Sequence, residues 1–493
     1  MKQAGLCGGA TPGRDLWLHA MNTLMQNLLF ACLAMLLCGG LATVPGIAAD
    51  ELTVEPLLDE QGRQLIPGGY VVIESVDYAP SDYERMVRMG ATFQVIRVPL
   101  GKIGGWKGVS SDPSYFDQAD KLVRMGTDVG IKTIFKLVVY GIRPFGDQQW
   151  DQLWHNTNES QETLMAAWSK IWIRYKDDPS VFGYDLLNEP QRGLDRDYDR
   201  CQREQLIPLL RRLADAMHEI SPDKWAIYQP LLRKREDQSS PGKHPVVAIQ
   251  EPFGRERVIY APHLYQMDPS VIAPMLDDFQ RQAILSNAPL LLGEWGSPTR
   301  ATTDGNPAEQ ARYTKVYQRT VNELDTRCIG GIKAWFCGAR KPIPVPGSTN
   351  WMTWAVFSDK SPAGRVERKY ITDVIVRPRP LVVAGRLKHY SNDFATRRFE
   401  MTLTPDVTLG STEIFLPADR HYPRGCLVEV GPGLALALDP NSHQLQTVNA
   451  VTTGDRNQAE LIRWDNASQR LFIDEWAVKA ARLRVSIVPA EVD

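Results

Sequence analysis

The sequence has no C-x-x-C pair among its seven cysteines, no excess of one charge, and no long repeat or low-complexity tract. The missing cysteine pairs argue against a zinc centre or a thioredoxin-type redox site. Lys and Arg total 56 and Asp and Glu total 58, so the net charge of -2 gives no reason to expect nucleic acid or an anionic membrane as a partner. The length of 493 residues suits a barrel of roughly 250–350 residues plus a smaller module.

One long apolar run is present, from Leu24 to Val44. Small residues and an acidic one follow it at Ala48-Ala49-Asp50, which is typical of a secretory signal. We expect residues 1–49 to be a leader cleaved after Ala49, giving a secreted or periplasmic protein without a stable membrane span. Few positive charges precede the run, so an uncleaved spanning helix of about 20 residues is the alternative. Cys38 follows Leu37, which disfavours a lipid anchor there.

An oxidising compartment would permit a disulfide among the cysteines that follow the leader. These are Cys201, Cys328, Cys337 and Cys426. Cys328–Cys337 is one candidate pair, although spacing alone does not determine the pairing.

Eight short runs of branched apolar and aromatic residues alternate with segments of helical spacing. The runs are nearly continuous in apolar character, which is typical of strands buried on both faces of a parallel sheet. Eight such strands over roughly 300 residues fit a (β/α)8 barrel better than a doubly wound sheet. The predicted strands are Tyr70–Ile73, Phe93–Pro99, Thr133–Val139, Val181–Leu187, Trp225–Gln229, Val258–Pro262, Pro289–Gly293 and Gly331–Phe336.

Three intervening segments carry apolar stripes with the spacing of one helix face, so we expect helices that pack on the sheet. The stripes are Leu164, Trp168, Ile171, Trp172 and Tyr175; then Leu206, Leu209, Leu210, Leu213, Met217 and Ile220; and Tyr313, Val316, Tyr317, Val321 and Leu324.

The residue pattern of the sequence changes after about Ile375. Arg377-Pro378-Arg379-Pro380 is interpreted as a linker, and short apolar runs separated by Gly, Pro and Asn turns follow it. This pattern predicts a smaller all-β sandwich domain over residues 376–493. Its expected strands are Arg398–Leu403, Thr412–Phe415, Leu427–Val430, Ala435–Leu438, Leu471–Ile473 and Leu483–Ile487.

Two glutamates stand directly after predicted buried strands, Glu189 before Pro190 and Glu294 before Trp295. Because the strands of a parallel barrel all point the same way, residues at their ends meet at its C-terminal mouth. Two carboxyl groups about 5–5.5 Å apart are what a retaining glycosidase needs, one as proton donor and one as nucleophile. A single such Glu often only caps the next helix, but neither Pro190 nor Trp295 favours an immediate helix start.

The stretch from Tyr175 to Pro190, with its Asp-Leu-Leu-Asn-Glu-Pro ending, resembles the fourth-strand signature of family 5 glycoside hydrolases, which are retaining barrel enzymes. Other positions of that family follow in the same order between about Gly68 and Ile375. They are Arg97 on the second strand, His263 and Tyr265 on the sixth, Glu294 on the seventh and Trp335 on the eighth. The resemblance implies a catalytic (β/α)8 barrel over residues 50–375.

The resemblance also implies roles. Glu189 would be the acid/base and Glu294 the nucleophile that forms a glycosyl ester. No metal or organic cofactor is implied, because both reacting groups come from the protein. The remaining matches would bind substrate or hold the carboxylates: Asn188 at the sugar 2-OH, Arg97 and Tyr265 at Glu294, His263 at a carboxylate or the substrate, and Trp335 as a flat face for a sugar ring. Taken singly, Arg97 could be a buried ion pair, His263 a core histidine, and Tyr265 and Trp335 barrel filling.

The third strand departs from the family pattern, because it lacks the histidine that members usually carry at its end. Tyr140 or His155 could fill that space, and Lys136 is an unusual residue for such a strand. A plain cellulase is therefore not expected. Trp150 and Trp154 in the following loop could be sugar platforms or loop packing.

The segment Val376–Gly385 resembles the junction in the endoglycoceramidase-like branch of family 5, where a β-sandwich follows the barrel directly. That branch acts on glycolipids or other β-glucosides with a bulky aglycone. The partner is therefore expected to be a carbohydrate or glycolipid substrate, and the sequence carries no signal for an oligomeric state. Hydrolysis of a β-linked glycan or glycoside is the main expectation; transglycosylation, glycolipid hydrolysis and an inactive carbohydrate-binding protein are the alternatives.

Overall fold

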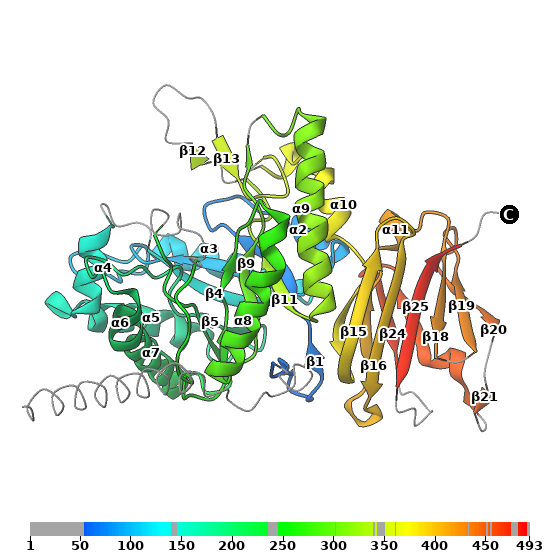
Figure 1. Ribbon diagram of the computed structural model, residues 1–493, viewed down its shortest axis with the longest axis horizontal. Coiled ribbons are helices and arrows are strands. Elements are labelled where there is room, and N and C mark those ends of the chain that lie inside the picture. Colours follow the sequence, from blue (N-terminus) through cyan, green and yellow to red (C-terminus); the bar gives the residue numbers. More distant parts are fainter. Residues whose placement is uncertain are drawn as a thin grey trace, which may run out of the picture. The chain divides into compact units, whose positions relative to one another are not determined.

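The computed structural model describes residues 54–139, 145–234, 245–300, 302–338, 341–342, 351–359, 361–431, 433–449, 452–453, 456–474 and 482–490 (Figure 1). Residues from Val54 onward form one compact unit by their contacts. No helix within the described ranges is both long and apolar enough to cross a membrane. The expected leader and its alternative, a spanning helix, lie outside the described residues.

The barrel is a parallel sheet with the strand order β7-β6-β5-β4-β3-β2-β11-β9-β8. Its two ends, β7 and β8, flank Ala261-Pro262 and are halves of one interrupted strand, and a parallel bridge from Tyr260 to Leu290 closes the ring. Proline has no N–H for the ladder, which explains the break. The predicted (β/α)8 barrel is thus confirmed. Its strands are β2 (Gly68–Val72), β3 (Phe93–Pro99), β4 (Lys132–Val138), β5 (Val181–Asp185), β6 (Trp225–Tyr228), β7 (Val258–Tyr260), β8 (His263–Leu264), β9 (Leu291–Trp295) and β11 (Gly330–Lys333).

Helices alternate with these strands and bury their apolar stripes. The stripe of α5 from Leu164 to Tyr175 is buried throughout, as predicted. Local sequence fixes where helices begin: Asp112 and Asn306 each accept a backbone N–H of the first turn, and a proline follows each of them. The barrel helices are α2 (Pro80–Arg88), α3 (Pro113–Asp128), α4 (Asp147–Trp154), α5 (Ser160–Tyr175), α6 (Tyr198–Cys201), α7 (Ile207–Ile220), α8 (Ile272–Ser286), α9 (Pro307–Thr326) and α10 (Lys369–Ile375).

The C-terminal region consists of two antiparallel sheets that share one apolar core, so the predicted β-sandwich is confirmed. Successive side chains of a strand point to opposite faces of the sheet, and in β16 the side chains of Phe399, Met401 and Leu403 point into the core. The first sheet is β1 (Gln64–Leu65), β14 (Arg379–Val383), β17 (Thr412–Phe415), β24 (Arg470–Ile473) and β23 (Ile462–Asp465). The second is β15 (Gly385–Asp393), β16 (Arg398–Pro405), β25 (Leu483–Pro489), β18 (Cys426–Val430), β19 (Leu434–Leu438) and β20 (Leu445–Asn449).

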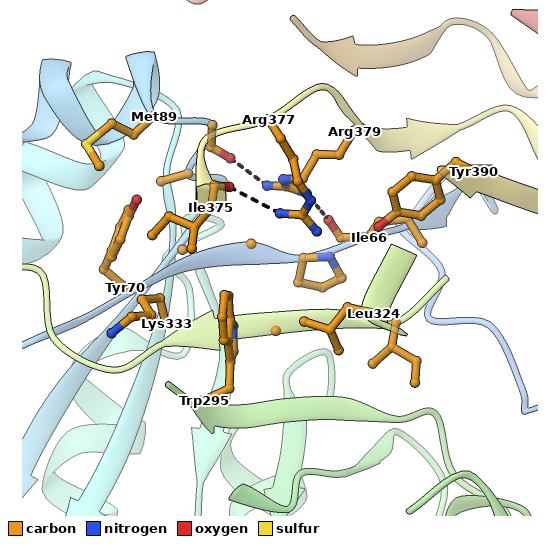
Figure 2. A pocket seen from close by; sticks show the side chains of 17 residues that line it. Ile66, Tyr70, Met89, Trp295, Leu324, Lys333, Ile375, Arg377, Arg379 and Tyr390 are labelled. Atoms are coloured by element: carbon orange, nitrogen blue, oxygen red, sulfur yellow. Dashed lines mark hydrogen bonds between the residues drawn. The ribbon is translucent and has the colours of Figure 1, made fainter. Parts of the chain in front are cut away.

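The interpretation of Arg377–Pro380 as a linker is wrong. Arg377 is buried and forms an ion pair with Asp325 of α9, while Arg379 opens strand β14. Arg379 donates hydrogen bonds to the carbonyl groups of Ile66 and Gly90 at the base of the barrel, and Figure 2 shows the two guanidinium groups side by side there. Strand β1, which precedes the barrel in sequence, also pairs with β14. The two domains are therefore joined by buried polar contacts and a shared sheet.

The candidate disulfide is also wrong, because Cys328 and Cys337 are both free thiols. Strand β11 runs between them, so they lie at opposite ends of an extended segment. A disulfide requires Cα atoms about 4.4–6.8 Å apart, which that separation does not allow. Cys201 and Cys426 are free and buried as well.

Candidate active site

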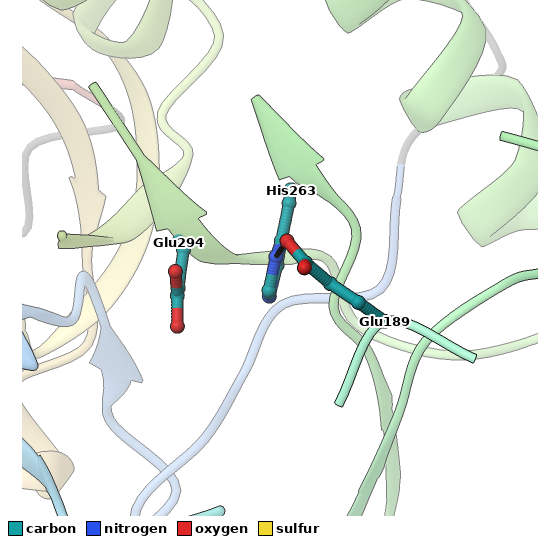
Figure 3. Close-up of side chains that lie close together, drawn as sticks. All are labelled: Glu189, His263 and Glu294. Carbon is teal, nitrogen blue, oxygen red and sulfur yellow. Dashed lines mark hydrogen bonds and ion pairs between the residues drawn. The ribbon is translucent and has the colours of Figure 1, made fainter. Parts of the chain in front are cut away.

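The two predicted carboxylates meet at the mouth of the barrel. Glu189 follows strand β5, and Glu294 is the fourth residue of β9. A carboxylate oxygen of each and a ring nitrogen of His263 all lie within 4.8 Å of one another. Figure 3 shows the imidazole of His263 between the two carboxyl groups. The strand ends converge here as expected, and the two carboxyl groups face each other.

Glu294 is almost fully buried and is held at both oxygens. Lys136 of β4 donates to Oε1 at 2.8 Å, and the Tyr265 hydroxyl donates to Oε2. Burial raises the pKa of the Glu294 carboxyl, but the charge of Lys136, the neighbouring His263 and the two hydrogen bonds outweigh it and lower the pKa to about 2. This carboxyl group is therefore ionised at neutral pH, as a nucleophile must be.

Glu189 has a more open environment, with 37% of its side chain exposed. Its backbone adopts φ of +47°, a left-handed conformation that is costly for a residue with a side chain. Gln229, just past β6, accepts the Glu189 N–H at 2.9 Å and donates to Asp185 at 2.7 Å, which secures this turn. His263 Nδ1 lies 2.9 Å from Glu189 Oε1 and orients the carboxyl group.

Arg97 and Asn188 lie on the neighbouring strand ends. Arg97 forms two hydrogen bonds with Glu74, at 3.0 and 3.1 Å, and Lys136 on the next strand is in hydrogen-bond contact with Glu294. Asn188 donates its backbone N–H to Leu137, and its side-chain Oδ1 is buried without a hydrogen-bond partner among the described residues. A buried acceptor left open in this way is suited to a ligand hydroxyl.

Three aromatic side chains are joined by ring contacts, beginning with Tyr265 beside Glu294. Trp335 packs edge-on against Trp354 with ring centres 4.9 Å apart, and Trp354 in turn packs on Tyr265 at 6.0 Å. Trp335 has φ of +50° and is only 6% exposed, so its ring is held tightly in place.

Of the two residues suggested for the third-strand space, His155 does not occupy it, because it is exposed and pairs with Asp151. Tyr140 lies outside the described residues. Trp150 and Trp154 of α4 are buried and stack on each other with ring centres 5.4 Å apart. Loop packing is therefore the interpretation that fits these two tryptophans.

Glu189, His263 and Glu294 also have the composition of a metal site. Lys136, however, places its ammonium 2.8 Å from Glu294 and 3.4 Å from His263 Nε2. A divalent cation at this point would be repelled by that charge and would have to displace its hydrogen bonds. The donor set therefore fits an acid–nucleophile pair better than a metal centre.

Sequence reasoning missed two polar residues that hold the site and gave a third no role. Glu74 comes two residues after β2 and Gln229 directly after β6, so the strand-end rule that selected Glu189 could have selected them. Lys136 lies inside a strand, where the sequence showed it as an unusual charge in an otherwise apolar run but did not show its partners.

A closed parallel barrel with two facing carboxylates at its mouth defines a glycoside hydrolase of the barrel type. Residues 77–330 match the family described as cellulase (glycosyl hydrolase family 5), and residues 377–479 match the glycoside hydrolase family 5 C-terminal domain. The chain belongs to glycosyl hydrolase family 5, which confirms the resemblance seen in its motifs.

Among characterised relatives, endoglycoceramidase I from Rhodococcus hoagii (strain 103S) is 25% identical over 318 residues, a match that spans 60% of this chain and 56% of that protein. Among solved structures, endo-glycoceramidase II from Rhodococcus sp., seen as a lactosyl-enzyme intermediate, is 20% identical with a TM-score of 0.63, covering 89% of this chain and all of that one. Sterylglucosidase 1 of Cryptococcus neoformans is 11% identical with a TM-score of 0.61, covering 89% and 96% of the two chains. These structural likenesses show that the two-domain fold is shared.

Proposed function

We propose that the protein is a retaining β-glycosidase that hydrolyses O-glycosidic bonds by double displacement. The observation that carries this proposal is the approach of Glu189 and Glu294, whose nearest carboxylate oxygens lie within 4.8 Å. Retaining enzymes hold their carboxyl groups about 5–5.5 Å apart, whereas inverting enzymes leave about 6.5–9.5 Å for a water molecule. The gap here suits direct attack on the anomeric carbon.

In the first step, Glu294 attacks the anomeric carbon while Glu189 gives its proton to the leaving oxygen. The contacts from Lys136 and Tyr265 keep the Glu294 carboxylate ionised and fix its direction of attack. Glu189 is the more exposed of the two carboxyl groups, which suits a group that must reach a leaving group and later a water molecule.

In the second step, Glu189 removes a proton from water, and the water hydrolyses the Glu294 ester. The open Oδ1 of Asn188 is available to accept from a sugar hydroxyl next to the reacting carbon. A sugar hydroxyl in place of water would give transglycosylation through the same ester. Product analysis with an added glycoside acceptor separates these two outcomes.

For the substrate, we propose a β-glycoside with a bulky apolar aglycone, such as a glycolipid. Relatives named endoglycoceramidase support this, one of them seen in complex with the ganglioside GM3. The directly joined C-terminal domain and the ring contacts among Tyr265, Trp335 and Trp354 agree with it.

The test is an assay of purified protein on β-glucan, β-mannan and glucosylceramide, with the anomer of the first product followed by NMR. We expect release of the β-anomer from the glycolipid. A 2-deoxy-2-fluoro glycoside with an activated leaving group should label Glu294, as located by peptide mass spectrometry. Initial release of the α-anomer, or label on another residue, would contradict the double displacement.

We also propose that the protein acts outside the cytoplasm. The apolar run from Leu24 to Val44 and the small residues before Asp50 support this. N-terminal sequencing of the secreted or periplasmic protein should give Asp50 as the first residue. Recovery of the uncleaved chain in the membrane fraction would favour an anchor instead.

A further inference from the structure

Strand β4 carries Lys136 within a run of buried side chains. In the parallel register, Lys136 lies beside Arg97 of β3 and Asp185 of β5, so the three side chains share the inner face of the barrel. Lys136 and Asp185 are each only 1% exposed. Burying an ammonium group costs several kcal/mol unless charges and hydrogen bonds compensate for the lost water.

The surroundings of Lys136 compensate for that cost with one acceptor for each of its three N–H groups. Glu294 Oε1 lies at 2.8 Å, the Gly293 carbonyl oxygen at 3.2 Å and His263 Nε2 at 3.4 Å. Asp185 Oδ2, at 3.7 Å, adds a second negative charge at ion-pair distance. The lysine is therefore held at one point by atoms from three other strands.

The contact with His263 determines the tautomer of the imidazole. An ammonium group only donates hydrogen bonds, so Nε2 must accept from Lys136, and the ring proton lies on Nδ1. Nδ1 is 2.9 Å from Glu189 Oε1 and donates to it. Lys136 thus contacts the nucleophile directly and reaches the acid/base through a single ring.

We propose that Lys136 is a positioning residue, which keeps Glu294 ionised and fixes the His263 tautomer that orients Glu189. The inference rests on the proposed glycosidase function. When the bond from the anomeric carbon to the leaving oxygen breaks, a bond to Glu294 forms and the Glu189 proton moves to the leaving oxygen. One negative charge thereby passes from Glu294 to Glu189, and Lys136 lies where it can balance that charge in both states without moving.

The electrostatics of Glu294 support this arrangement. Burial is the largest influence on its pKa and raises it, and the charge of Lys136 is the largest influence that lowers it. Without Lys136, the influences left to oppose burial would include His263 and the Tyr265 hydroxyl but not the largest one. The titratable groups that face Glu294 are Lys136 from β4, Asp185 from β5, Glu189 after β5, His263 and Tyr265 from β8 and its end, and Lys333 from β11.

The test compares the full-length variants Lys136→Met and Lys132→Met on aryl β-glycosides with good and poor leaving groups. Lys132 lies on the same strand but is exposed, where it donates to the Pro179 carbonyl, so its variant is the matched control. In Lys136→Met we expect the acid limb of the kcat/KM profile to move up by about one pH unit or more. We also expect a greater loss with the poor leaving group, because Glu189 is no longer oriented. Lys136→Arg, which keeps the charge, should restore part of the acid limb.

An unchanged acid limb in a folded Lys136→Met variant would overturn the inference while leaving the glycosidase function intact. A wild type without activity on any glycoside would instead refute the proposed function. If Lys136→Met does not fold, the wild type gives the answer through pH-jump inactivation by a 2-deoxy-2-fluoro glycoside. The inference expects a rate that stays level well below pH 4.5, the ordinary pKa of a glutamate, and a midpoint near 4.5 would overturn it.

Discussion

The mouth and the base of the barrel both bury cations, but they pair them differently. At the mouth, Lys136 faces two carboxylates and an imidazole, all of which can change protonation or charge. At the base, Arg377 faces the single carboxylate of Asp325, and Arg379 donates to backbone carbonyl groups (Figure 2). A buried cation among several groups that change charge can serve chemistry, whereas one held by a single carboxylate or by backbone carbonyl groups can only stabilise the structure. Substitutions at the two ends should therefore separate activity from stability.

Loss of the proposed nucleophile should give the largest effect at the mouth. Glu294→Gln removes the attacking carboxylate and should lower kcat by on the order of 10⁴- to 10⁶-fold. Urea unfolding at neutral pH should show that the variant remains folded. A variant with more than about a tenth of wild-type turnover would show that Glu294 is not the nucleophile.

Glu189→Gln should distinguish the two carboxyl groups, because the activity lost in this variant should depend on the leaving group of the substrate. A good leaving group needs no proton, so formation of the glycosyl-enzyme should survive, and added azide should restore turnover. General acid–base help contributes about 10²- to 10⁴-fold, which is the loss expected with a poor leaving group. Equal losses with both leaving groups would contradict the assigned role.

Substitutions at the base of the barrel should change the free energy of unfolding rather than the activity. Asp325→Leu leaves Arg377 buried without its carboxylate and should lower the free energy of unfolding by about 3–5 kcal/mol. The double variant Asp325→Leu/Arg377→Met removes both charges and should recover most of that loss. Activity per folded molecule should stay near wild type. A single variant within about 1 kcal/mol of wild type would mean that the pair does not join the domains.

Low pH should lower the free energy of unfolding by protonating Glu294. Its pKa is about 2 in the folded protein and 4.5 ordinarily, so the ionised group contributes stability above pH 4.5 that is lost as the pH falls toward 2. The stability difference between wild type and Glu294→Gln should shrink between about pH 5 and about pH 3, by at most about 3 kcal/mol over the full range. Urea unfolding at both pH values measures it, and a constant difference would contradict the lowered pKa.

An exposed ion pair across the same junction should give the smallest effect. Arg88 of α2 contacts Asp419 of the sandwich, and both side chains are at least 40% exposed. Arg88→Ala should change the free energy of unfolding by under about 1 kcal/mol, because water and salt screen the pair. A loss as large as that of Asp325→Leu would show that burial is not what distinguishes the two contacts.

Much of the fold could be predicted because its signals are local. The apolar run of β3 coincides with the predicted strand Phe93–Pro99, and the stripe of α5 is buried as its spacing indicates. The two carboxylates could be predicted because parallel strands bring their ends together whatever the details of packing.

The remainder depends on contacts between distant parts of the chain. Proline and arginine at 377–380 look like a linker until Asp325 and the carbonyl groups of the barrel base are placed beside them. The sequence around Lys136 of β4 does not show its partners, because His263 and Glu294 come from strands β8 and β9. Pairing over such sequence distances leaves no periodic trace in either segment.

The pairing of strand β1 with β14 affects whether the C-terminal sandwich can be expressed as a separate fragment. Residues 64–65 leave the ribosome before the barrel, yet they form the outer strand of a sheet whose other members are made last. The sandwich expressed by itself would therefore expose the free edge of β14, and such an edge recruits other chains. A fragment that begins at residue 377 should aggregate, whereas a covalent graft of residues 54–66 onto that fragment should keep it monomeric.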